Sequence, residues 1–359
     1  MTQSPLQDLR RRAGLLVMRG FRGCSVDGDD AVVTDLRECG LGSVVLFDTD
    51  GPTGSSERNV QSPQQLRSLT DSLRAASGDG PTPLIAIDQE GGLVARLKQR
   101  HGFPGVASAR ELAERGDPDV TEAAVGALAQ TLVAAGINLN LAPVVDVDVR
   151  GDNPIIGGKG RSFSADPEEV AAHAGAFIRA HRDRGVLTCL KHFPGHGSSR
   201  DDSHAGFTDV TKTWSRDELI PFRRLLEEGL ADAVMTAHVF NAAFDDTYPA
   251  TLSPAAIGGL LRDELGFDGV VISDDMGMGA ISKNYGFEEA VARSLGAGVD
   301  LLILANQTTY EDDITERTVD LIVDLVAAGR LQERRVDEAA ERVLRLRSLI
   351  SEERLYLNG

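Results

Sequence analysis

The sequence predicts a single (β/α)8 barrel, an α/β fold in which eight parallel strands alternate with helices. The chain has 359 residues, and one barrel with elaborated loops accounts for roughly 250 to 400. Short apolar runs alternate with amphipathic segments along the whole chain, which is the pattern of repeated parallel βα units. The runs are continuously apolar, as expected for strands buried on both faces.

Eight apolar runs are long enough to form strands. They are residues 15–21, 43–47, 84–88, 138–147, 186–193, 233–240, 269–275 and 299–304. Eight units favour a closed barrel over an open, doubly wound sheet. The count depends on the weak first run, so the open sheet stays as an alternative.

The segments between the runs have helical periodicity, and several begin with Ser or Asp directly before Pro. That order combines a helix N-cap with a proline at the first helical position. Examples of that order are residues 62–76, 166–184 and 253–265, and residues 286–298 form a further helical segment that begins with Gly. The tail from 311 to 359 predicts two more helices. Because no linker or repeat interrupts the pattern, we expect residues 1–359 to form one domain.

The composition excludes some partners. The net charge of −18, from 55 acidic and 37 basic residues, repels nucleic acid and anionic membrane surfaces. The three cysteines, Cys24, Cys39 and Cys189, lack the spacing of a disulfide framework or a zinc knuckle. The start of the sequence lacks the apolar stretch of an export signal. We therefore expect a soluble, cytoplasmic protein that binds neither nucleic acid nor membranes; its oligomeric state is not readable.

Charged and polar residues gather at the ends of the predicted strands. They are Asp88, Lys191, His192, His238, Asp274 and Asp275. In a barrel the carboxyl ends of the strands meet at one mouth, where active sites are built. Any one of these residues could simply cap a strand or form an ion pair, but so many on one rim predict a site.

The adjacent carboxylates Asp274 and Asp275 point to opposite faces if their strand continues, so only one faces the barrel axis. A carboxylate at the axis, kept ionised by a nearby Lys or Arg, is what a retaining glycosidase needs as a nucleophile.

The segment KHFPGHGSSRDDSH, residues 191–204, is the richest in polar groups. Asp202 precedes His204 by two residues, so it could orient and charge the imidazole for proton transfer near neutral pH. The glycines and serines indicate that residues 195–210 form a mobile catalytic loop. The alternative is a zinc site, with ligands His192, His196, Asp202 and His204. Its spacing is no standard zinc signature, and Pro194 prevents the helical geometry of H-E-x-x-H.

These motifs resemble the family three glycoside hydrolases, and within them the single-domain β-N-acetylglucosaminidases (β-N-acetylhexosaminidases) with a histidine acid/base. The matching stretches are LIAIDQEGGLVARL (84–97), NPIIGGKGRSFSADP (153–167), KHFPGHG (191–197), DSH (202–204), VMTAH (234–238) and VISDDMGMGAI (271–281). KHFPGHG together with DSH is the most specific of them.

The resemblance implies that Asp274 attacks the anomeric carbon to form a covalent glycosyl-enzyme. It implies that His204, oriented by Asp202, acts first as acid and then as base. Residues at the family positions that hold the hydroxyls of the terminal N-acetylglucosamine are Asp88, Arg96, Arg161, Lys191 and His192. The implied substrate is a small carbohydrate, from muropeptides or chitin, and no metal or cofactor is implied.

The sequence departs from the family pattern in three places. The loop GGKGRSF before Arg161 is longer than the usual I-G-x-R-S-F, Ser198-Ser199 replaces Asp-Thr, and Phe207-Thr208 replaces Leu-Pro. Two other functions stay open: a phosphorylase using the same residues with phosphate in place of water, and a non-catalytic sugar-binding barrel. The two-domain β-glucosidase branch fits less well, since those enzymes usually take their acid/base from another domain.

Overall fold

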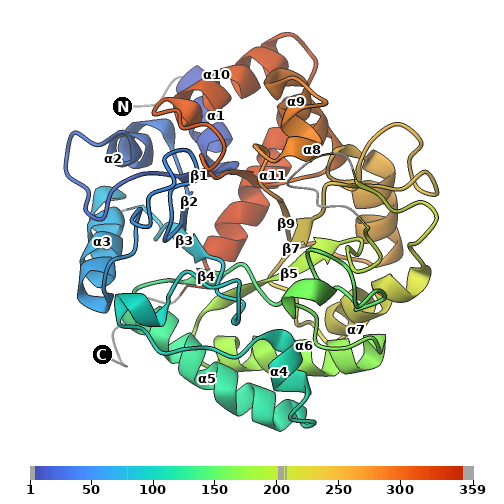
Figure 1. Cartoon of the computed structure of the whole chain (residues 1–359). Coiled ribbons are helices and arrows are strands. Elements are labelled where there is room, and N and C mark those ends of the chain that lie inside the picture. The colour runs from blue at the N-terminus through green and yellow to red at the C-terminus, as the bar shows by residue number, and fades with distance from the viewer. Residues whose placement is uncertain (1–4, 79, 201–205, 207, 351–359) are drawn as a thin grey trace.

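The computed structural model describes residues 5–78, 80–200, 206 and 208–350. Within them, eight parallel strands form one sheet in the order β10-β1-β2-β3-β4-β5-β7-β9. The two ends of the sheet meet, because the backbone N–H of Ser273 donates to the carbonyl of Leu301 at 2.9 Å, next to β10. Helices surround this barrel (Figure 1). The predicted (β/α)8 fold is therefore confirmed, and the open sheet is wrong.

Each barrel strand lies within one of the eight predicted runs. The strands are β1 (Val17–Gly20), β2 (Ser43–Leu46), β3 (Leu84–Ile87), β4 (Leu139–Asn140), β5 (Leu187–Phe193), β7 (Ala233–Thr236), β9 (Val270–Ser273) and β10 (Leu302–Leu304). Two runs are longer than their strands. The run 138–147 pairs regularly only at β4, and Pro143, which has no N–H to donate, follows shortly after. The run 233–240 divides into β7 and β8 (Val239–Phe240), and β8 pairs with β6 (Thr208–Asp209) in a separate sheet.

The helices also follow the sequence signals. They are α1 (Pro5–Leu15), α2 (Ala31–Thr34), α3 (Pro63–Ala76), α4 (Ala109–Ala113), α5 (Pro118–Ala134), α6 (Pro167–Arg182), α7 (Ile220–Glu227), α8 (Gly279–Ser282), α9 (Phe287–Ala297), α10 (Ile314–Ala327) and α11 (Glu333–Arg347). Ser62 caps α3 in a reciprocal capping box with Gln65, and Asp166 caps α6. The segment 253–265 forms a wider, π-type helix, η6 (Ala255–Glu264).

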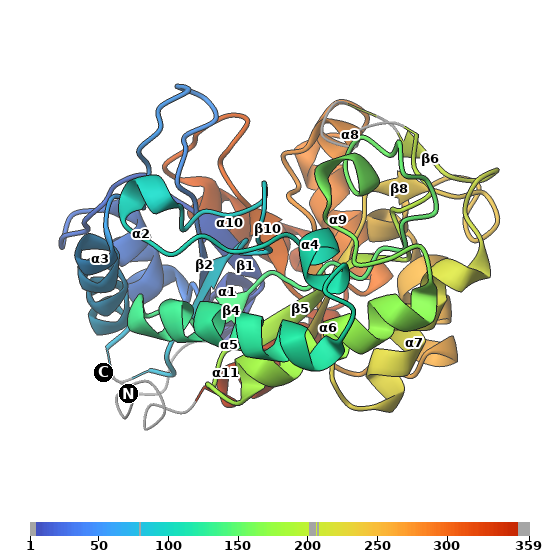
Figure 2. The ribbon, with the colours of Figure 1, turned by 60° about the horizontal axis from the view of Figure 1, so that its bottom comes forward.

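Helix α11 covers the amino-terminal mouth of the barrel. Its Val343 and Leu346 pack with apolar side chains of the barrel strands, among them Met18 and Leu84. Its basic residues reach the segments that lead into the strands: Arg347 donates to the carbonyl of Thr82 at 3.0 Å, just before β3. Figure 2 shows α11 on the side of the barrel away from α8. The carboxyl ends of the strands are thus left to form the opposite, open mouth.

The cysteines form no disulfide bond among themselves. All three cysteines are free thiols; Cys189 is buried, and Cys24 and Cys39 are half-buried. Across the residues that the structure describes, none of the helices combines the length and the apolar character needed to span a bilayer.

Candidate active site

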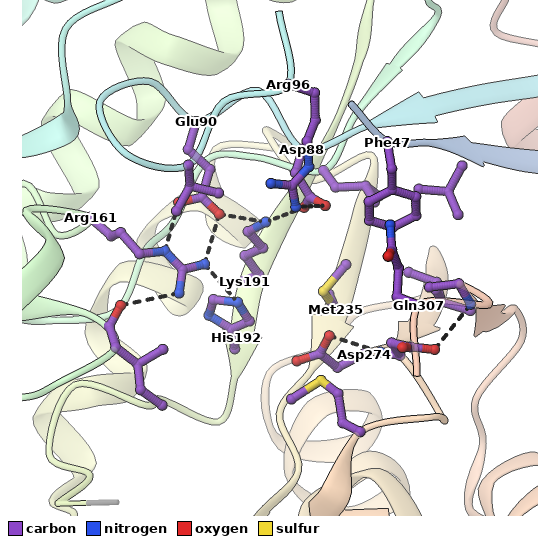
Figure 3. A pocket seen from close by; sticks show the side chains of 18 of the residues that line it. Phe47, Asp88, Glu90, Arg96, Arg161, Lys191, His192, Met235, Asp274 and Gln307 are labelled. Atoms are coloured by element: carbon purple, nitrogen blue, oxygen red, sulfur yellow. Dashed lines mark hydrogen bonds and ion pairs between the residues drawn. The ribbon is translucent and has the colours of Figure 1, made fainter. Parts of the chain in front are cut away.

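A pocket of about 480 Å³ lies at the carboxyl-terminal mouth of the barrel (Figure 3). Its volume falls within the range of small-molecule sites. The strand ends and the loops after them supply its lining, which includes Phe47, Asp88, Glu90, Arg96, Arg161, Lys191, His192, Met235, Asp274 and Ile303. The pocket thus brings together the predicted nucleophile and all five predicted sugar-binding residues, whereas His238, also at a predicted strand end, is not part of its lining.

A cluster of ion pairs occupies one side of this pocket, and we call it the charged cluster: Asp88, Glu90, Arg96, Arg161 and Lys191. The Lys191 ammonium lies 2.8 Å from Asp88 and 2.7 Å from Glu90. Arg161 donates to both oxygens of Glu90, at 2.8 and 2.7 Å, and Arg96 donates to Asp88 at 3.2 Å. Lys191 is only 2% exposed, so this lysine depends on its two carboxylates for charge compensation.

The charged cluster keeps its members ionised. Burial by itself would raise the pKa of Asp88, but the positive charges of Lys191 and Arg96 outweigh it and hold the pKa below its ordinary value. Glu90 has a lowered pKa for the same reason, with Arg161 as the stronger partner. Burial works against the charge of Lys191, yet Asp88 and Glu90 raise its pKa. The pocket therefore contains groups with fixed charges, which can form strong hydrogen bonds with the hydroxyl groups of a ligand.

His192 is oriented by a buried carboxylate, Asp146. Its Nδ1 lies 2.7 Å from Asp146 Oδ2, and its Nε2 lies 3.3 Å from Nη2 of Arg161. Since a guanidinium can only donate, Nε2 acts as the acceptor and the proton is assigned to Nδ1. The other oxygen of Asp146 accepts the backbone N–H groups of His192, at 3.2 Å, and of His196, at 2.8 Å. His196 also lines the pocket, and burial lowers its pKa to about 4.

Asp146 and Glu90 are the site residues that sequence reasoning missed. Both had a signal: Asp146 is the charged residue within the predicted run 138–147, and Glu90 stands two residues after Asp88 in the motif DQEGG. Both carboxylates act mainly on other side chains of the site, which a single sequence does not reveal.

Asp274 lies across the pocket from the charged cluster, with its carboxylate facing the open space (Figure 3). Its backbone N–H donates to the carbonyl of Thr236 at 3.2 Å, which ties it to β7. Its Oδ1 accepts the N–H of Asp275 at 2.8 Å.

The neighbouring Asp275 is engaged with its own loop. Its Oδ1 accepts the backbone N–H groups of Gly277, at 3.2 Å, and Ala305, at 3.0 Å. Nε2 of His238 lies 3.0 Å from the backbone carbonyl oxygen of Asp275. His238 therefore also contributes to holding this loop. Of the two adjacent residues, Asp275 thus accepts hydrogen bonds from its own loop, while the carboxylate of Asp274 faces the open pocket.

Asp202 and His204 lie outside the described residues. The segment before them, residues 195–199, is buried. Asn153 donates to the carbonyls of His196 and Gly197 at 2.9 Å each, and Glu218 accepts the N–H of Gly197 at 3.0 Å. At the other end of the predicted mobile loop 195–210, Thr208–Asp209 pairs with β8 as strand β6. Both ends of this segment are thus held by contacts, and residues 201–205 and 207 between them lie outside the described part of the chain.

The structure does not test the zinc hypothesis fully, because two of the four proposed ligands, Asp202 and His204, lie outside the described residues. Among the side chains whose placement is given, no three His, Cys, Asp or Glu groups gather as a metal site.

Glu218 gives a prediction on stability. Its carboxylate is buried beneath residues 195–199, and burial raises its pKa to about 7. Because the folded protein binds this proton more tightly than the unfolded chain, the free energy of unfolding should fall as the pH rises from about 4.5 to about 7. The effect is up to about 3 kcal/mol. Glu218→Gln should remove this dependence, measured as denaturant unfolding at about pH 5 and pH 8. Equal pH dependence in both proteins would contradict the assignment.

The fold and the site define a class of protein. A (β/α)8 barrel whose carboxyl-terminal mouth holds a carboxylate opposite a cluster of buried and half-buried charges is the arrangement of a glycoside hydrolase. Residues 11–346 match the model of the glycosyl hydrolase family 3 N-terminal domain, and the chain belongs to this family. The family resemblance predicted from the motifs is thereby confirmed.

Relatives and solved structures agree with this membership. The chain is 37% identical over 299 residues to a beta-hexosaminidase of Alkalilimnicola ehrlichii, covering 81% of this chain and 80% of the relative. It is 40% identical over 276 residues to the beta-hexosaminidase LpqI of Mycobacterium tuberculosis, covering 74% and 69%. A family 3 beta-N-acetylglucosaminidase structure from Paenibacillus sp. str. FPU-7 aligns with a TM-score of 0.85 at 34% identity, over 98% of this chain and 67% of that one.

Proposed function

We propose that this enzyme hydrolyses terminal β-linked N-acetylglucosamine from glycosides, with retention of configuration at the anomeric carbon. The single observation that carries the proposal is the Asp274 carboxylate, which faces the pocket opposite the charged cluster. The names of the beta-hexosaminidase relatives support the choice of sugar. Muropeptide fragments and chitin-derived oligosaccharides are the substrates that fit the proposal.

In the first half of the reaction, a carboxylate oxygen of Asp274 forms a bond to the anomeric carbon and the bond to the leaving oxygen breaks. His204, oriented by Asp202, gives its proton to the leaving oxygen. In the second half, a water oxygen attacks the anomeric carbon, its proton passes to His204, and the bond to Asp274 breaks. A histidine in this role carries no permanent negative charge, so it does not raise the pKa of the nucleophile.

The charged cluster and His192 would hold the terminal sugar. Asp88 accepts from hydroxyls, Arg96 and Arg161 donate, and Lys191 supplies a fixed positive charge on the same side of the pocket. Because these groups already pair with one another, they need no rearrangement when the sugar binds. Such preorganisation places the anomeric carbon over Asp274 at little entropic cost.

The products test both the stereochemistry and the acceptor. With 4-nitrophenyl β-N-acetylglucosaminide, proton NMR should show the β-anomer of N-acetylglucosamine first, because two displacements at the same carbon retain configuration. The α-anomer appearing first would contradict the mechanism. The same assay with phosphate should give no N-acetylglucosamine 1-phosphate; its formation would establish the phosphorylase instead.

The remaining alternatives predict different results. A non-catalytic sugar-binding barrel would bind N-acetylglucosamine without any turnover. The zinc hypothesis predicts that a chelator abolishes activity and that zinc restores it.

A further inference from the structure

We propose that Lys159 forms a subsite for a negatively charged group on the leaving part of the substrate, so that the enzyme favours aglycones bearing a carboxylate next to the scissile bond. This inference rests on the proposed function and deepens it.

Lys159 differs from the other cations of the pocket in its charge pairing. Arg96, Arg161 and Lys191 each form an ion pair with Asp88 or Glu90. Lys159 lines the same pocket, and it forms no ion pair with any acidic side chain in the described part of the chain. It is therefore the pocket cation whose charge is available to a ligand.

The backbone that carries Lys159 is held in place. Lys159 ends a single turn, η3 (Gly157–Lys159), and Gly160 follows in the left-handed conformation at φ 65°. Asn153 accepts the N–H groups of Ile155 and Ile156 at 2.8 Å each, and Arg110 donates to the carbonyl of Gly157 at 2.9 Å. Since hydrogen bonds with Asn153 and Arg110 hold this turn, the backbone position of Lys159 is fixed, and its side chain extends from there.

The burial of the lining indicates which part of a substrate would meet Lys159. Glu90 and Lys191 are the buried members of the charged cluster, at 6% and 2% exposure, and its other three members are half-buried. Lys159 is half-buried as well, and Leu93, on the same pocket, is 74% exposed. A terminal sugar enters the buried side first, so its leaving group extends toward the exposed side. Lys159 and Leu93 would therefore contact the aglycone and not the terminal sugar.

The negative net charge of the protein means that an anionic ligand needs a local positive charge in order to bind. A net charge of −18 repels anionic ligands, and Asp274 and Asp275 add negative charge within the pocket. An aglycone carboxylate would bind poorly there without a local positive charge. Lys159 also lies in GGKGRSF, a loop in which the sequence departs from the family pattern.

The test compares two substrates of the same shape. They are the disaccharide of N-acetylglucosamine β-1,4-linked to N-acetylmuramic acid, and the same compound with its lactyl carboxylate converted to the amide. 4-Nitrophenyl β-N-acetylglucosaminide measures the basal activity. The variants are Lys159→Met and Lys159→Arg, with Lys212→Met as a control that removes the same charge at an exposed position.

Lys159→Met should lower kcat/KM for the acid by about three- to tenfold, mainly through KM, and leave the amide and the nitrophenyl substrate within about twofold. Lys159→Arg should keep most of the preference, and Lys212→Met should change nothing. Raising the ionic strength from about 0.05 to about 1 M should weaken the wild-type preference for the acid.

Three outcomes would overturn the subsite. One is an equal effect of Lys159→Met on acid and amide, which would mean a general electrostatic role. Another is cleavage of the nitrophenyl substrate but of neither disaccharide. The third is a phosphate-dependent rate that Lys159→Met abolishes, since the bound anion would then be phosphate. Failure of the proposed function looks different: the wild type would cleave none of the three substrates.

Discussion

Replacing Asp274 with Ala or Asn is expected to lower kcat/KM for 4-nitrophenyl β-N-acetylglucosaminide by roughly four orders of magnitude, because the covalent intermediate can no longer form. The fold should survive, since the Asp274 carboxylate faces the open pocket and is not part of the barrel core. The rate is measured at saturating and limiting substrate, and the fold by thermal unfolding.

Asp275→Asn is the matched control, because it removes the neighbouring carboxylate but keeps an oxygen that can accept from Gly277 and Ala305. We expect its activity to stay within about tenfold of the wild type, since it loses charge and not the nucleophile. Added azide should partly rescue Asp274→Ala and give the α-glycosyl azide. Substantial activity of Asp274→Ala without azide would refute the nucleophile assignment.

Glu90→Gln is expected to cost about 3 kcal/mol of unfolding free energy, because it leaves Arg161 and Lys191 short of a buried counter-charge. The Tm should fall by roughly 5 °C. Activity should fall as well, by about a hundredfold, since both cations lose the partner that orients them.

The stability difference between wild type and Glu90→Gln should also depend on pH. Glu90 has a lowered pKa in the folded protein, so its contribution is present above its unfolded pKa of about 4.3 and decreases as the pH falls below it. Glu57→Gln is a control, because Glu57 is an exposed glutamate on a loop outside the pocket. A Tm for Glu90→Gln equal to that of the wild type at neutral pH would show that the charged cluster does not depend on this carboxylate.

The sequence predicted the barrel because burial on both faces leaves a direct signal. Apart from Ser43 at the start of one and Asp88 at the end of the other, the runs at 43–47 and 84–88 are apolar, and β2 and β3 lie within them. The boundaries were less predictable. The run 138–147 stays apolar beyond β4 because the chain continues through the interior, with the N–H of Val145 donating to the carbonyl of Lys191 at 2.7 Å. Apolar character reports burial, and it does not report ladder pairing.

Only part of the candidate site could be predicted from the sequence. Asp88 and Asp274 directly follow buried strands and Lys191 lies within one, where a charge is costly and therefore informative. Asp146 also follows a strand, yet its importance comes from three hydrogen-bonding groups that the fold brings to it, two backbone N–H groups and the ring of His192. The partner of a charged group depends on the tertiary structure, and a single sequence carries little record of it.

The closure of the barrel has a consequence for its synthesis. Strand β1 pairs with β10, with Val17 opposite Leu302, so the first strand lacks one neighbour until the ribosome has made the last. At about 5 to 20 residues per second, that interval lasts roughly 15 to 60 s. During this time the nascent chain exposes an unpaired, apolar strand edge, which is a site for aggregation. We therefore expect β1 to be a segment of the growing polypeptide that needs protection by a chaperone.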